Sequence, residues 1–254
     1  MMSKAPEIEF SQVSKRFGAG PLVLDGLDLR AAPGEFISVI GPSGCGKTTF
    51  LRMVAGLSQP SGGKIRFGKQ SDGARPELAF IFQEATLLPW LTVLANIELP
   101  LRLRGEPLAR RRKTAERLAA ELGLGAAGRY HPRQLSGGMK MRVSLARALS
   151  LSPDVLLLDE PFGALDAITR NRLNEDLLAL HRREGWSAFF VTHSVTEAVF
   201  LADRILVLAA DPARVETIIT VDLPRERTLA LRESDEFHDA VAEATRRMHN
   251  ILAR

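Results

Sequence analysis

The sequence contains a single cysteine, Cys45, so no disulfide can form within the chain. It has no apolar run long enough to cross a bilayer, and its first residues lack the apolar core of a signal peptide. Internal repeats and low-complexity segments are also missing. With 254 residues, 45% of them hydrophobic and 25% charged, we expect a globular chain that stays in the cytosol.

An excess of one charge is likewise absent. The 34 Lys and Arg residues are interleaved with 30 Asp and Glu residues, which leaves a net charge of +4 at pH 7. This mixture favours a solvated surface over a nucleic-acid-binding one, so we predict no nucleic-acid partner. The basic cluster at residues 110–113 is interpreted as a solvated helix face first and as a contact for anionic lipid second.

What is present is a glycine-rich loop that fits the pattern G-x-x-x-x-G-K-[ST]. An apolar, β-branched run at residues 35–40 precedes it, and residues 50–57 follow with apolar positions at helical spacing. In this strand–loop–helix context, backbone N–H groups and the helix dipole form a seat for polyphosphate. The predicted phosphate-binding residues are Gly41, Pro42, Ser43, Gly44, Cys45, Gly46, Lys47, Thr48 and Thr49.

Two side chains of this loop carry specific chemistry. Lys47 would reach the β and γ phosphates, and the hydroxyl of Thr48 would bind Mg²⁺. An ordinary glycine turn is the alternative, and the flanking strand and helix argue against it. The loop therefore predicts a nucleoside triphosphate and Mg²⁺ as ligands.

Further polar residues stand where predicted strands end. Asp159 and Glu160 follow the buried run 155–158, so Asp159 would hold Mg²⁺ and Glu160 would polarise the attacking water. Gln83 follows another strand, and its amide could reach the metal or its water. His193 lies at the end of a third strand, where ligand chemistry gathers in parallel sheets.

A second anion seat is predicted at Ser136, which would cap a helix whose first residues are Gly137 and Gly138. A plain capped helix is the alternative. Because the loop at Gly41 already accounts for one end of the nucleotide, a second copy of the chain could meet this seat. That arrangement predicts a head-to-tail dimer with ATP between the subunits.

The order of strands and helices predicts an α/β fold with antiparallel strands at residues 8–13 and 22–29, ahead of the main sheet. Phe17, between them, is either a partly buried aromatic or a face for adenine stacking. We predict a nucleotide-binding core at residues 1–86 and 151–225, an inserted helical subdomain at 87–150 and a helical tail at 226–254. The apolar face of the tail should pack on its own domain; its residues are Phe237, Val241, Ala244, Met248 and Ile251.

Taken together and in this order, the motifs resemble those of the ATP-binding cassette (ABC) ATPases. The matching segments are 41–48 (Walker A), Gln83 (Q-loop), 136–138 (signature), 155–159 (Walker B), Glu160 (catalytic acid), 163–166 (D-loop) and His193 (switch histidine). The resemblance implies a P-loop NTPase core of the RecA type, with an N-terminal antiparallel β subdomain and an inserted helical subdomain.

The resemblance also implies a sandwich dimer, in which Ser136 and Gly138 of one subunit cover the γ-phosphate held by Lys47 of the other. His193 would contact the γ-phosphate, and Phe17 and Asp166 would belong to the nucleotide site. Three positions depart from the usual family residues, namely Met139 for Gln, Gly163 for Ser and Phe17 for Tyr. None of them removes a charge or a metal ligand.

More narrowly, residues 87–93, 135–139 and 161–166 are similar to ATPase subunits of importers for nitrate, sulfonates and taurine. This similarity implies a peripheral subunit on the cytoplasmic face of the membrane, working with a separate permease and, indirectly, a solute-binding protein. The apolar run 87–93 near Gln83 would receive a coupling helix of the permease. The alternatives are a non-transport ABC ATPase and a P-loop kinase, although a kinase would not explain Ser136 or His193.

Overall fold

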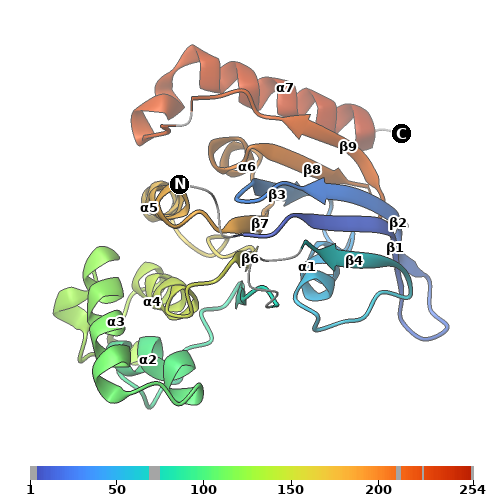
Figure 1. The fold of residues 1–254 in the computed structure, drawn as a ribbon. Coiled ribbons are helices and arrows are strands. Elements are labelled where there is room, and N and C mark those ends of the chain that lie inside the picture. The colour runs from blue at the N-terminus through green and yellow to red at the C-terminus, as the bar shows by residue number, and fades with distance from the viewer. Residues whose placement is uncertain (1–4, 69–74, 210–212, 225, 253–254) are drawn as a thin grey trace.

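The computed structural model describes residues 5–68, 75–209, 213–224 and 226–252, and these form two sheets surrounded by helices (Figure 1). The smaller sheet has the order β2–β1–β4. Strand β1 (Ile8–Arg16) pairs antiparallel with both β2 (Leu22–Ala31) and β4 (Gly62–Phe67). The antiparallel sheet predicted ahead of the main one is thereby confirmed.

The main sheet has six strands, of which the first five in spatial order are parallel. They are, in order, β5 (Leu78–Ile81), β6 (Val155–Asp159), β7 (Ser187–Val191), β3 (Phe36–Ile40), β8 (Arg204–Leu208) and the antiparallel edge strand β9 (Val215–Thr220). Every residue of β3, β6 and β7 is buried, as expected for parallel strands covered on both faces. Because parallel strands share one carboxyl edge, the segments after β3, β5, β6 and β7 meet there.

Alternation along each central strand divides the core between the two faces of the sheet. On β6, Leu156 and Leu158 belong to one hydrophobic cluster, and Val155 and Leu157 belong to the other. The second cluster includes the small sheet and helix α1 (Lys47–Val54), and the first includes the remaining helices. The main sheet is therefore the middle layer of the molecule.

Three helices form the inserted block beside β5, namely α2 (Val93–Leu103), α3 (Leu108–Glu121) and α4 (Gly137–Leu149). The structure describes every residue from 87 to 150 and contains no strand there, as predicted. The apolar run 87–93 is only partly exposed, because the buried amide of Asn96 bonds the backbone of Leu88 and Leu91 and folds the run onto α2. Trp90 remains 70% exposed.

Helices α5 (Ala167–Glu184) and α6 (Val195–Leu201) cover the sheet on the same face as the tail helix α7 (Asp235–Leu252). Along the tail, Phe237 and Ala244 are buried and Val241 and Met248 pack against the core, so the expected docking on its own domain is confirmed for these four. The side chain of Ile251 lies outside the described residues. In the part of the chain that the structure describes, no helix combines the length and apolarity that crossing a membrane requires.

A buried arginine joins the tail to α6. Arg227 is 6% exposed, and its Nη1 donates to the carbonyl oxygens of Val199, Phe200 and Ala202 at 3.2, 3.1 and 2.9 Å. Burial lowers the pKa of Arg227, and the nearby Asp203 opposes that shift. The guanidinium therefore satisfies the last carbonyls of a helix that is too short to be stable alone.

Replacing Arg227 by Met is expected to lower the free energy of unfolding by about 2–4 kcal/mol, because buried carbonyls lose charged donors while the volume is kept. Urea unfolding of both proteins measures the change. Arg246→Met is the matched control, since Arg246 is exposed and pairs only with Glu243. A loss at Arg227 no larger than that of the control would contradict the role assigned to it.

Candidate active site

The loop between β3 and α1 is shaped by three glycines. A Cβ on Gly41 would lie 2.5 Å from the carbonyl oxygen of Leu208, so the neighbouring strand leaves no room for a side chain. Gly44 and Gly46 have φ angles of 80° and 94°, in the left-handed region that glycine adopts without strain. Gly46 also precedes the first turn of α1, so the loop curls directly onto the positive end of a helix.

Lys47 closes over this loop. Its side chain is buried, and Nζ donates to the carbonyl oxygens of Gly41 at 2.9 Å and Pro42 at 2.8 Å. An ammonium group has three N–H donors, so one more remains for a phosphate oxygen. The loop therefore holds a fixed positive charge beside its backbone N–H groups.

Thr48 and Asp159 meet at the carboxyl edge of the sheet. The Thr48 Oγ1 donates to Asp159 Oδ1 at 3.0 Å, and Asp159 is 8% exposed. Burial raises the pKa of Asp159, the bond from Thr48 opposes that shift and the charge of Glu160 adds to it. A hydroxyl and a carboxylate are oxygen donors of the kind that Mg²⁺ prefers.

This donor set fits magnesium better than a transition metal. In the described ranges, no group of three or more His, Cys, Asp or Glu side chains is arranged so that it could hold a metal ion. Mg²⁺ needs no such cluster, since it is commonly held by one or two protein oxygens together with substrate phosphates and water. Thr48 and Asp159 are the residues that would hold it.

Asp159→Asn is expected to stabilise the chain near neutral pH without nucleotide or Mg²⁺, while removing Mg²⁺-dependent hydrolysis. Because folding raises the pKa of Asp159, its ionised form costs stability above that pKa, and the cost vanishes as the pH falls below the ordinary value of 3.8. The advantage of the variant should be largest near neutral pH and shrink toward about pH 4. Urea unfolding at several pH values measures it, and a variant less stable than wild type at neutral pH would oppose the prediction.

Glu160 and His193 are brought into direct contact. The Glu160 Oε1 lies 2.6 Å from His193 Nε2. Glu160 has a φ of 48°, which is unusual for a residue other than glycine, and its N–H donates to the carbonyl oxygen of Val191 on the adjacent strand at 3.0 Å. Together with Gln83, these two side chains line a cavity of about 350 Å³. The ends of β5, β6 and β7 thus converge on one space.

Residues that the sequence did not single out hold His193 in place. The Thr192 Oγ1 donates to the buried Glu197 at 2.5 Å and accepts from the N–H of Ser194 at 3.0 Å. Ser194 in turn caps α6 by accepting from the N–H of Glu197 at 3.2 Å. The pattern S-x-x-E over residues 194–197 is a helix-capping signal, so the cap of α6 by Ser194 could have been predicted from the sequence.

The segment after Gln83 is fastened to the helical block by Arg147 of α4. Its guanidinium donates to the carbonyl oxygens of Thr86 at 2.9 Å and Ala85 at 3.1 Å, and also to the Thr86 hydroxyl. Burial lowers the pKa of Arg147. Arg147 therefore ties α4 to the loop that carries Gln83.

The glycines at the start of α4 pack against the start of α5. Ser136 caps α4, its Oγ accepting from the N–H of Met139 at 3.3 Å. A Cβ on Gly138 would lie 2.6 Å from Thr169 Cγ2, and a Cβ on Gly137 would lie 3.3 Å from Leu165. Both glycines thus permit close packing of α4 against the start of α5.

Asp166 caps α5. Its Oδ1 accepts from the N–H of Thr169 at 3.0 Å, and this bonding lowers the pKa of Asp166. The structure gives the residue a local role, and its role toward nucleotide stays a prediction. Figure 1 places α4, which Ser136 caps, apart from α1, which follows the phosphate loop.

Gly138→Ala is expected to cost about 1–3 kcal/mol of stability and to lower ATPase activity, because the new methyl group collides with Thr169. Adding Thr169→Ser, which removes the colliding Cγ2, should restore most of both. Gly125→Ala is the matched control, since a Cβ there meets nothing within 4 Å. Equal effects at Gly125 and Gly138, measured by urea unfolding and phosphate release, would contradict the packing argument.

Phe17 and Cys45 differ in exposure. The ring of Phe17 is 55% exposed, with Lys15 Nζ 4.8 Å from its centroid, so the aromatic is only partly buried and a face for stacking is available. Adenine stacking on it stays a prediction. Cys45 is 4% exposed and burial raises the pKa of its thiol, so it acts as a packing group and should react slowly with alkylating reagents.

Comparison with known proteins relates this chain to proteins that bind ATP. The family model described as ABC transporter matches residues 24–163. An ATP-binding protein of Brucella abortus (strain 2308) is 48% identical over 233 residues, covering 91% of this chain and 89% of that protein. The taurine import ATP-binding protein TauB of Chromobacterium violaceum is 47% identical over 206 residues, covering 80% of this chain and 79% of that protein.

A solved structure shares the fold. It is described as the dimeric structure of a post-hydrolysis state of the ATP-binding cassette MJ0796 bound to ADP and Pi. The TM-score is 0.74 with 30% sequence identity, and the match covers 85% of this chain and all of that chain. The predicted fold class is confirmed by this likeness.

Proposed function

Because this chain belongs to the ABC transporter family, we propose that it is the ATP-hydrolysing subunit that powers import of a small anionic solute through a separate membrane permease. Nitrate, a sulfonate or taurine is the expected kind of solute. The chain is an ATPase that binds ATP with Mg²⁺. The observation that carries the hydrolytic part is the contact of Glu160 with His193, in a cavity that Gln83 also lines. The likeness to a taurine import ATP-binding protein supports the import part.

Each residue of the site has a separate role in hydrolysis. The N–H groups of the loop and Nζ of Lys47 would bind the phosphates, and Thr48 and Asp159, which already contact each other, would hold the metal. When bound, Mg²⁺ neutralises charge on the β and γ phosphates. Glu160 orients the water and accepts its proton, while His193, positioned by Glu160, donates toward the γ-phosphate. Catalysis is mostly positioning and charge stabilisation, as in other phosphoryl transfers.

The site is completed by a second copy of the chain. Ser136 begins α4 and lies apart from the phosphate loop of its own subunit (Figure 1), although both features are suited to phosphate. A head-to-tail dimer would place Ser136 and Gly138 of one subunit over the nucleotide of the other. The dimeric state of the solved relative supports this arrangement.

The permease would dock on the exposed apolar side chains around α2. Trp90 is 70% exposed just before the helix, and Leu103 is 80% exposed at its end. Tyr130, 46% exposed, adjoins its first turn, since the N–H of Val93 donates to the Tyr130 carbonyl oxygen at 2.8 Å. Large exposed aromatics next to the loop of Gln83 are suited to receive a short helix of a partner. The subunit would then lie peripherally on the cytoplasmic face of the membrane, with a solute-binding protein acting indirectly.

Purification of the tagged chain from its native membranes tests the proposal. An integral membrane permease should co-purify, and proteoliposomes containing the complex should take up nitrate or taurine when ATP is supplied. Trp90→Asp should lose the permease while the isolated subunit still hydrolyses ATP, and Leu57→Asp, at an exposed residue after α1, is the matched control. Recovery with ribosomes or DNA and no permease would reject transport in favour of a non-transport ABC ATPase.

A further inference from the structure

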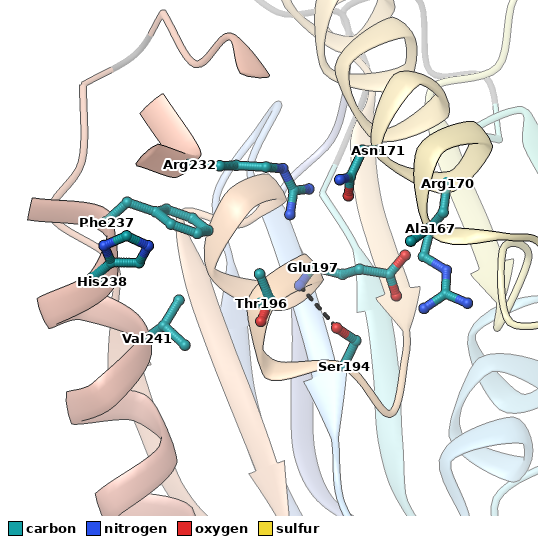
Figure 2. A pocket seen from close by; sticks show the side chains of 10 residues that line it. All are labelled: Ala167, Arg170, Asn171, Ser194, Thr196, Glu197, Arg232, Phe237, His238 and Val241. Atoms are coloured by element: carbon teal, nitrogen blue, oxygen red, sulfur yellow. Dashed lines mark hydrogen bonds between the residues drawn. The ribbon is translucent and has the colours of Figure 1, made fainter. Parts of the chain in front are cut away.

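A second cavity, of about 440 Å³, lies between α5, α6 and the tail (Figure 2). It borders the catalytic cavity, because both are lined by Arg170, Ser194 and Glu197. The 3₁₀ helix η3 (Leu229–Glu233) and the start of α7 form its outer wall through Arg232, Phe237 and His238. Nothing in the mechanism above uses this space.

Arg232 forms no ion pair within the described residues. Its Nε and Nη2 are inaccessible to solvent and have no hydrogen-bond partner. In the described part of the chain its contacts are with rings, the guanidinium carbon lying 4.1 Å from the centroid of Phe200 and 5.8 Å from that of Phe237. A charged group held this way retains a large cost unless an acceptor joins it. Figure 2 shows the guanidinium pointing into the cavity toward Asn171.

Other hydrogen-bond donors face the same space. Within the described residues, the side chains of Asn171, Thr196 and His238 make no hydrogen bond, and all three line the cavity. Arg170 stands on the far side; its Nη2 donates to the carbonyl oxygen of Leu165 at 2.7 Å, and its Nε has no partner. The cavity therefore offers unused donors from three elements.

The acids around the cavity are already engaged. Glu197 is the one carboxylate in the lining, and its oxygens accept from Thr192 at 2.5 Å and Asn174 at 3.4 Å. The charges of Glu197 and Glu175 attract Arg232, but neither carboxylate is hydrogen-bonded to it, and the Oε1 of Glu175 accepts from the N–H of Leu229 at 3.1 Å. The lining carries two guanidinium groups against one carboxylate that is already bonded, so hydrogen-bond donors outnumber free acceptors there.

We propose that this cavity is a binding site for a small oxyanion, held by Arg232 with help from Asn171 and Thr196. The planar guanidinium matches the paired oxygens of a sulfate, sulfonate or carboxylate. Binding supplies the acceptor that Arg232 lacks and so strengthens the docking of the tail on α6. The site rests on these contacts alone and does not depend on a role in transport.

Titration calorimetry tests the site with sodium sulfate, taurine and sodium acetate at constant ionic strength. A saturating non-hydrolysable ATP analogue with Mg²⁺ keeps these probes out of the phosphate loop. Wild type should bind at least one oxyanion with a Kd on the order of 1 mM, and Arg232→Gln should weaken it by at least about tenfold. Arg246→Gln, on the exposed face of α7, should bind like wild type. Preferred binding of sulfate would indicate a free inorganic anion as the ligand, and preferred binding of taurine or acetate would indicate an organic sulfonate or carboxylate.

A second variant keeps the test sound if Arg232→Gln folds poorly. Asn171→Asp places a carboxylate in the cavity without disturbing the stacking of Arg232. It should abolish binding of the added oxyanion and raise the urea midpoint of the chain, because the protein then supplies the missing acceptor. Equal oxyanion binding by wild type and both cavity variants, or no binding by wild type, would overturn the proposal.

Discussion

Glu160→Gln is expected to lower the rate of ATP hydrolysis by about 10²–10⁴-fold and to leave ATP affinity nearly unchanged. The amide keeps the size of the carboxylate but cannot accept the proton of the attacking water. The groups that hold phosphate and metal, Lys47, Thr48 and Asp159, are untouched by the change. ATP should therefore be bound and kept.

The retained ATP should trap the dimer. Size-exclusion chromatography of the variant with ATP and Mg²⁺ should show a dimer that persists, whereas the wild type should return to monomer as ATP is consumed. Glu184→Gln is the matched control, because Glu184 is a solvated residue at the end of α5 and should behave as wild type. A variant that elutes as a monomer with ATP and Mg²⁺ would count against Glu160 as the activator of water.

Ser136→Arg is expected to abolish hydrolysis while the isolated subunit still binds ATP. The arginine would project from the start of α4 toward the phosphates of the partner subunit in the proposed head-to-tail dimer. Nucleotide binding by the monomer uses Lys47 and the loop, which lie apart from α4. Equal loss of binding and hydrolysis would place Ser136 in the site of its own subunit.

Mixing two inactive variants gives the decisive control. In a dimer of Lys47→Ala with Ser136→Arg, one site carries both lesions and the other carries neither. Random mixing should restore up to about a quarter of wild-type activity, since half of the dimers are mixed and each has one intact site. No recovery in the mixture would exclude a site shared between subunits.

The sequence predicted the individual residues of this site better than the contacts between them. Buried apolar runs ending in Asp159, Gln83 and His193 are readable as strands, because strands covered on both faces are apolar throughout. The contact between Glu160 and His193 could not be predicted from the sequence, because it requires β6 and β7 to be neighbours in the sheet. Strand order depends on crossover packing, which leaves no local pattern in the sequence.

Elements fixed by tertiary contacts were also missed. Helix α6 has five consecutive buried residues, Glu197 to Leu201, so it shows no helical alternation of polar and apolar positions. Helix α2 contains Pro100, a residue that usually argues against a helix interior. The buried amide of Asn96 fixes the segment before the helix by bonding the Leu88 carbonyl oxygen. Arg147 gave no sign of its bonds to Thr86, since an arginine on a helix is usually solvated.

The hydrogen bonds from Arg227 to the end of α6 have a consequence for folding cooperativity. Helix α6 is seven residues long, yet Ser194 secures its first turn and Arg227 its last carbonyls. A helix secured at both ends cannot fray independently, so its opening requires the tail to detach as well. His193, which precedes α6, and the tail thus belong to one unfolding unit, and damage to the tail reaches the carboxyl edge of the main sheet without touching the residues proposed for catalysis.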